Sequence, residues 1–168
     1  MVPLLPPHFH TLNAVEGWLG LGLPAEAQAE LDQLPAELRM HRFVLNAQYS
    51  IHSKRADWDA AHALAEMTLA LYPEVAEGWI HRAYAARRRP GGGLDAAYVA
   101  LLPAAEKFPR EGMIPYNLAC YCAQKGQLSD AWRWYRAARK IADPTQLRKM
   151  ALKDEDLKPL WAQITQLV

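Results

Sequence analysis

The 168-residue chain has few of the groups from which a specialised site is usually built. It contains only two cysteines, Cys120 and Cys122, which are two residues apart on a predicted helix. Side chains at that spacing point to nearly opposite sides of a helix, so the two sulfurs cannot pair with each other. We therefore expect two buried, reduced thiols rather than a disulfide or a metal site.

The chain also lacks the signals that direct a protein to a membrane or to nucleic acid. No apolar run approaches the ~20 residues that a membrane-spanning helix requires. The first ten residues, MVPLLPPHFH, have neither the basic leader nor the long apolar core of a signal peptide. The formal net charge is only +1, from 19 basic and 18 acidic residues, whereas a nucleic-acid binder needs a broad basic surface. We expect a cytoplasmic protein that binds neither membrane nor nucleic acid.

No group of residues combines a nucleophile, a base and an orienting side chain. His8 and His10 have the spacing of a ligand pair, but no cysteine or carboxylate cluster accompanies them. Gly91–Gly93 follows no predicted strand, so we interpret it as a turn and not as a phosphate-binding loop. The acidic run 154–156 is interpreted as a solvated charge cluster on a polar linker. These absences predict a protein without enzymatic activity, cofactor or metal.

What the sequence does contain is a repeat. Alanine recurs at intervals of 34, 36 and 34 residues, at Ala27, Ala61, Ala97 and Ala131. Two further registers recur in step with it: Leu31, Ala65, Leu101 and Tyr135, and Leu34, Thr68, Ala104 and Ala138. A series on the preceding helices, Val15, Tyr49, Ala83 and Ala119, recurs at intervals of 34, 34 and 36 residues. The two extra residues fall in the glycine-rich stretch between Ala83 and Ala97, where a larger turn is easily accommodated.

The most regular unit runs from Pro115 to Pro144 and predicts two helices joined at Lys125-Gly126-Gln127. Small residues occupy the positions where two helices would touch, with large apolar residues between them: Ala119, Gly126, Ala131 and Ala138, and Leu118 and Tyr135. This pattern resembles the tetratricopeptide repeat (TPR), a helix–turn–helix unit of about 34 residues. The resemblance implies an all-α protein, a right-handed α-solenoid of about four repeats with a C-terminal capping helical segment.

We expect one TPR domain over residues 1–168, with repeats at about 8–35, 36–73, 74–109 and 110–144 and a cap at 145–168. The second repeat is predicted to have an elongated first helix. The cap is predicted to be an amphipathic closing helix, because it places these apolar residues at helical spacing: Leu157, Leu160, Trp161 and Ile164. The alternative, that the cap folds back into the groove of the solenoid, stays open.

TPR arrays usually bind a partner along the concave face, and the register implies which side chains line it here. They are Phe43, Asn46, Ser50, Ile80, His81, Tyr84, Arg87, Arg88, Met113, Tyr116, Asn117 and Gln124. This mixture of aromatic, amide and cationic groups suits a peptide segment. We expect Arg87 and Arg88 to receive an acidic-plus-aromatic segment or a free C-terminus. Two alternatives remain: several groove residues pack between helices, or the arginines only complement the end of their own helix.

The sequence therefore predicts a scaffold or adaptor whose partner is another protein or peptide. The alternative is a structural or self-associating subunit that uses its convex face or its ends, with Trp132 and Trp134 as candidate contacts. An enzyme is the most remote alternative, and the oligomeric state is left open.

Overall fold

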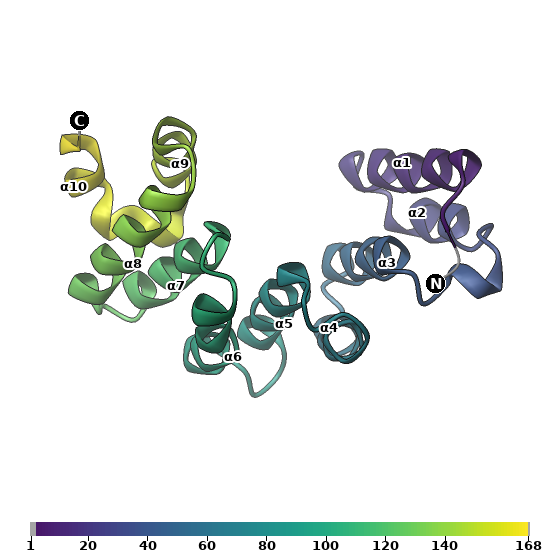
Figure 1. Cartoon of the computed structure of the whole chain (residues 1–168), viewed down its shortest axis with the longest axis horizontal. Helices are drawn as coiled ribbons and strands as arrows, with labels where there is room; N and C mark the ends of the chain where they lie inside the picture. Colours follow the sequence, from purple (N-terminus) through teal and green to yellow (C-terminus); the bar gives the residue numbers. More distant parts are fainter. Residues whose placement is uncertain (1–2, 168) are drawn as a thin grey trace. The chain divides into compact units, whose positions relative to one another are not determined.

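The computed structural model describes residues 3–167, and every regular element in this range is helical (Figure 1). The prediction of an all-α protein is confirmed. The chain divides into two compact units, unit 1 (residues 1–81) and unit 2 (residues 82–168). Among residues 3–167, none of the helices combines the length and the apolar character needed to cross a bilayer.

Unit 1 is built from helices that follow one another through short turns. α1 packs against α2 and α3, and α3 packs against α4. The elements are α1 (Pro6–Gly20), α2 (Pro24–Leu31), the 3-10 turn η1 (Ala36–Leu38), α3 (Arg42–Lys54), α4 (Trp58–Leu71) and the beginning of α5 (Ala76–Arg88). A core of side chains from α1, α2, η1 and α3 holds these elements together, and Val15 and Ile51 in it are fully buried.

Unit 2 continues from the remainder of α5 and contains a second core. α7 packs against α6 and α8, and the C-terminal elements pack against α7 and α8. The elements are α6 (Leu94–Lys107), α7 (Met113–Gln124), α8 (Leu128–Ile141), α9 (Pro144–Ala151), the 3-10 segment η2 (Glu155–Leu160) and α10 (Trp161–Gln166). α7 is the most enclosed helix of the unit, because nine of its residues are buried.

Three of the turns between paired helices share one backbone geometry. Gly22, Ala56 and Gly126 lie just after the ends of α1, α3 and α7, with φ of 76°, 56° and 75°. In each turn two backbone N–H groups bond back to the last turn of the helix, as Gly126 N does to Ala123 O at 3.0 Å. This is the Schellman ending, which favours glycine because a Cβ is strained at positive φ. It reverses the chain within a few residues and sets consecutive helices side by side.

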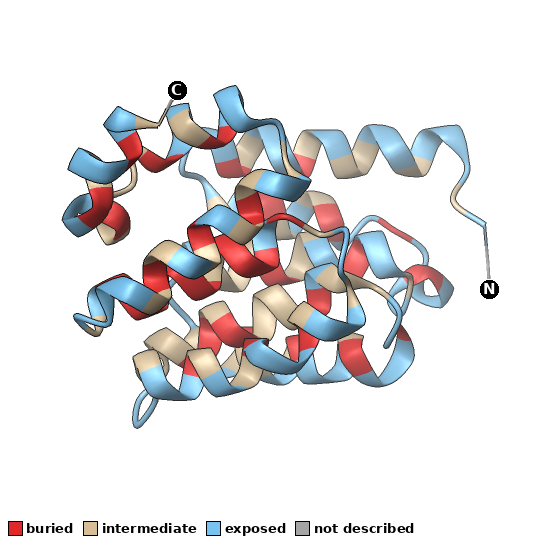
Figure 2. Cartoon of the chain, turned by 60° about the vertical axis from the view of Figure 1, so that its left-hand side comes forward, coloured by how far each residue is buried: buried red, intermediate tan, exposed pale blue. Residues whose placement is uncertain are grey.

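The repeated alanines are the contact points between these helices. Ala27, Ala61, Ala97 and Ala131 are each 0% exposed, and they lie on α2, α4, α6 and α8. Figure 2 shows the buried residues in red along the sides of the helices that face other helices. A methyl group at such a crossing lets two backbones approach closely, which is why the spacing of alanine alone predicted burial correctly.

The second repeat does not have the elongated first helix that we expected. Instead, the 3-10 turn η1 ends at Leu38 and a separate helix, α3, begins at Arg42. The His41 ring accepts a hydrogen bond from Phe43 N at 3.3 Å and so caps the new helix. Leu38 is 1% exposed and belongs to the core of unit 1, so the turn buries this side chain before α3 starts.

The prediction of a single closing helix at the C-terminus is also wrong. Residues 144–166 form α9, η2 and α10, and Pro159 lies within η2. Proline has no N–H to donate and cannot sit inside an α-helix without breaking a bond, so a continuous helix over this stretch is unfavourable. The apolar residues are still used: Leu157, Leu160 and Ile164 are all fully buried.

Candidate functional site

The candidate site is a cleft between α1 and α3 in unit 1. It has a volume of about 190 Å³. Its lining comes from both helices: Phe9, Leu12, Asn13, Val15, Glu16 and Leu19 from α1, and Phe43, Asn46, Ala47 and Ser50 from α3. The structure thus brings three predicted site residues, Phe43, Asn46 and Ser50, into one cleft.

Two exposed aromatic rings stand at the edge of this cleft. Phe9 and Phe43 are 45% and 39% exposed, and their ring centroids lie 6.5 Å apart in a tilted arrangement. The Arg42 guanidinium lies over the Phe43 ring, 4.4 Å from its centroid. Exposed phenylalanines so close together are unfavourable in water, so the pair forms a ready apolar contact for another chain.

Polar groups complete the cleft beside these rings. The amides of Asn13 and Asn46 form no side-chain hydrogen bond to any residue within 3–167, so both can bond a ligand. The Ser50 hydroxyl donates its hydrogen bond to Asn46 O, one turn back in the same helix, at 3.0 Å. Glu16 is the charged residue of the lining. The cleft therefore offers an apolar anchor point, two amides and a carboxylate.

The predicted groove residues of α5 are all half-buried. The His81 ring stacks on Tyr49 with centroids 3.8 Å apart and planes 5° from parallel, and the Tyr49 hydroxyl donates to His81 O at 3.0 Å. Burial lowers the pKa of His81 from 6.5 to about 4, so the imidazole is neutral at pH 7. Ile80 is half-buried, and Tyr84 is half-buried beneath the Arg88 guanidinium, 3.4 Å from its ring centroid.

His81 should make the protein less stable in mild acid. Its pKa is lower in the folded state, so the unfolded chain binds a proton below pH 6.5 while the folded chain resists it down to about pH 4. The free energy of unfolding should fall by about 3 kcal/mol across that window and level off below it.

The measurement is urea unfolding at several pH values, for the parent and for His81→Phe, which keeps a ring against Tyr49 but cannot titrate. Carboxylates titrate equally in both proteins, so the difference between the two curves isolates the histidine. A constant difference from pH 7 to pH 4 would contradict this account.

In unit 2 the corresponding face of α7 is covered by the chain's own C-terminal segment. Tyr116 is 3% exposed, and its hydroxyl donates to Asp154 Oδ2 at 2.8 Å. Gln124 Nε2 donates to Asp156 O at 3.1 Å. Met113 and Asn117, on the same helix, are exposed and half-buried. The C-terminal segment therefore packs against α7 on residues that were predicted to line the groove.

Two residues of the acidic run, Asp154 and Asp156, are not the solvated carboxylates that we expected, whereas Glu155 between them is exposed. The Arg87 guanidinium grips Asp156 with two hydrogen bonds, one of them 2.9 Å from Nη2 to Oδ1. The Cys120 thiol lies 3.6 Å from Asp154 Oδ2, to which it can donate. These contacts link positions up to 69 residues apart in the sequence, a separation that a local pattern cannot indicate. Arg87 is therefore engaged within the chain and not presented to a ligand.

The donors of this cluster stay protonated, and for Tyr116 and Cys120 burial is the main cause. It raises the pKa of Tyr116 and of Cys120, and the neighbouring carboxylates raise both further. The hydrogen bond to Asp156 raises the pKa of Arg87. The ligand atoms of Cys120, Asp154 and Asp156 lie within 4.8 Å of one another, close enough to share a cation. Arg87 already binds Asp156, and Tyr116 already binds Asp154. We therefore interpret the cluster as a set of hydrogen bonds that holds η2 against α7.

The near-neutral charge of the whole chain conceals two oppositely charged units. Residues 1–81 contain four basic and ten acidic residues, a formal charge of −6. Residues 82–168 contain 15 basic and eight acidic residues, a formal charge of +7. Counting charge by halves would have found this asymmetry in the sequence. Any charged partner will therefore distinguish the two units.

The two tryptophans predicted as candidate contacts on the convex face, Trp132 and Trp134, are both half-buried on α8. Trp132 stacks on Tyr135 with centroids 5.7 Å apart, and Trp134 packs against the core of unit 2. Trp132 also lines two hollows beside α8.

No protein-family model matches the chain, and no curated protein matches it.

Proposed function

We propose that this chain is a TPR-like right-handed α-solenoid that serves as an adaptor for another protein. Two observations support the repeat architecture. The alanine of each repeat is fully buried on the second helix of a pair, and three turns share the same positive-φ ending. A solenoid built in this way presents the first helices of its repeats as a continuous binding face.

The binding site in this proposal is the cleft between α1 and α3, and one observation carries it. The cleft leaves two phenylalanine rings exposed beside two amides that have no side-chain partner within residues 3–167. Buried aromatic anchors supply most of the energy at protein interfaces, and amides can bond the backbone of an extended segment.

The face of α7 is a poorer candidate because η2 already occupies it. Displacing that segment would break the Arg87–Asp156 pair and expose Leu157 and Leu160, which are 0% exposed. Burial of two leucines stabilises a fold by about 3–6 kcal/mol, and a short peptide would have to replace all of it.

Charge indicates the chemistry of the partner segment. Glu16 lies in the cleft, and unit 1 carries a formal charge of −6. A carboxylate-rich segment would be repelled, whereas a neutral or basic segment with an aromatic or aliphatic side chain is favoured. The two buried, reduced thiols suit a reducing compartment such as the cytoplasm.

Selection of peptides from a random display library made without aspartate or glutamate tests this proposal. Selected peptides should bind Phe43→Ala at least about tenfold more weakly, a change of about 1.4 kcal/mol, because the anchor loses its contact ring. Met67→Ala is the matched control, since Met67 is 41% exposed on α4 and lies outside the cleft. It should bind as the parent does.

Affinity can be read by fluorescence polarisation with each labelled peptide, and unfolding by heat confirms that both variants remain folded. Peptides that bind Phe43→Ala and the parent equally well would exclude the cleft as their site, as would a library that yields no binder.

A further inference from the structure

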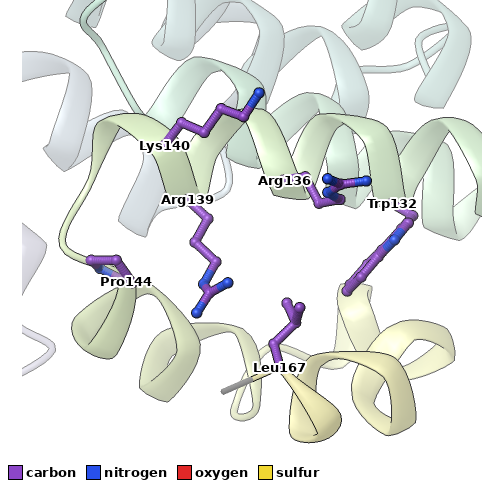
Figure 3. Close-up of a pocket in the computed structure, with 6 residues that line it drawn as sticks. All are labelled: Trp132, Arg136, Arg139, Lys140, Pro144 and Leu167. Carbon is purple, nitrogen blue, oxygen red and sulfur yellow. The ribbon is translucent and has the colours of Figure 1, made fainter.

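Another hollow lies in unit 2, between α8 and the C-terminal segment, and its lining differs in character from that of the cleft in unit 1. We call it the basic pocket; its volume is about 590 Å³. It is lined by Trp132, Arg136, Arg139, Lys140, Pro144 and Leu167. Figure 3 shows Trp132 and Arg139 on α8 with Arg136 between them, and Leu167 facing these side chains from the C-terminal segment.

The pocket combines cations with an apolar wall. Arg136 and Lys140 are exposed, and neither forms an ion pair with any residue from 3 to 167. A neighbouring hollow of about 540 Å³ shares Trp132, Arg136 and Lys140 with the basic pocket. It extends to Ile141, which is 38% exposed. Positive charge is therefore concentrated on one short stretch of helix beside exposed apolar surface.

We infer that the basic pocket binds an acidic segment of a partner protein, one that carries an aromatic or aliphatic side chain next to its carboxylates. Guanidinium groups form bidentate hydrogen bonds with carboxylates. The formal charge of +7 on unit 2 also attracts an acidic segment from solution. The apolar side chain lies against Trp132, Pro144 and Leu167. Unit 2 already shows this chemistry internally, because Arg87 grips Asp156 while the adjacent Leu157 is buried.

A peptide fits the pocket better than nucleic acid does. A phosphate backbone is neutralised by cations spread along an extended track. Here the cations fall within residues 136–140 and half of the lining is apolar.

The site does not depend on the cleft of unit 1, so the two proposals can fail separately. The probe is a short capped peptide of glutamate and aspartate around a central phenylalanine–leucine pair. Its amide version, with glutamine and asparagine in place of the acids, is the first control. The oligonucleotide dT12 and light scattering of the protein alone test the two other occupants.

The decisive variant is Arg136→Glu with Lys140→Glu. It should weaken binding of the acidic peptide at least about tenfold and remove most of its salt dependence. Arg110→Glu reverses an exposed charge in the same unit, outside the pocket, and should change affinity less than about threefold. Phe43→Ala should bind the acidic peptide as the parent does.

Four results would overturn the inference: no binding of the acidic peptide at millimolar concentration, equal binding of its amide version, equal losses in Arg110→Glu and the double variant, or tighter binding of dT12. Concentration-dependent association of the parent that the double variant abolishes would assign the pocket to a second copy instead.

Discussion

Replacing Leu160 with alanine is expected to lower the free energy of unfolding by about 2–5 kcal/mol. Leu160 is fully buried in the core of unit 2, where side chains from α7, α8, α9 and α10 meet. The substitution removes three carbons and leaves a cavity that a 3-10 segment held at both ends cannot collapse to fill. The expected loss is large because the C-terminal elements are part of the core and not a tail laid upon it.

Urea unfolding monitored by circular dichroism measures this loss. Leu128→Ala makes the same chemical change at the start of α8, where the side chain is 41% exposed, and should cost much less. If Leu160→Ala were as mild as Leu128→Ala, then η2 would be only loosely attached. The face of α7 would then be accessible to a partner after all.

The second large effect is expected from a pair of neighbouring alanines on α6. Ala97→Leu should destabilise the protein by about 1–3 kcal/mol, because Ala97 is 0% exposed at a helix contact and has no room for three more carbons. Ala96→Leu introduces the same side chain one residue earlier, where the position is exposed, and should change stability by less than about 0.5 kcal/mol.

The two variants have identical composition, so helix propensity and chain hydrophobicity cancel between them. Their melting temperatures therefore report only which alanine faces the neighbouring helix. Equal melting temperatures would show that the register of the repeat is misplaced.

The helices and the buried registers could be predicted from the sequence because both are local. A positive-φ turn favours glycine, and a close helix contact favours alanine. The residue types at Gly126 and Ala131 therefore indicate a turn and a buried helix contact. The turn at Ala56 shows the limit of this reasoning. It has the same geometry as its neighbours without the glycine that would reveal it.

The role of the acidic run could not be predicted in the same way. Nothing local distinguishes Asp154 and Asp156 from solvated carboxylates, and their partners Tyr116 and Arg87 are 38 and 69 residues away. Only the tertiary packing of η2 on α7 brings these groups together. Arg87 was interpreted as a ligand contact for the same reason, since a spacing cannot show that a cation already has a partner.

The cleft was predicted from one side only. The register identified Phe43, Asn46 and Ser50 on α3, and a shift of 34 residues toward the N-terminus leads to Phe9, Leu12 and Glu16 on α1. The 34-residue register therefore indicates the α1 side of the cleft as well. The prediction did not extend to the first repeat, because its first helix contains two glycines and follows the pattern least regularly.

The claim that the cleft of unit 1 is the peptide-binding site can be tested most directly with ring-labelled phenylalanine. The chain contains only three phenylalanines: Phe9 and Phe43 at the cleft, and Phe108 in unit 2 as an internal reference. At saturation with a peptide from the acid-free library, the NMR signals of the first two rings should shift and that of Phe108 should not. Unmoved signals from Phe9 and Phe43 in a saturated complex would contradict the account.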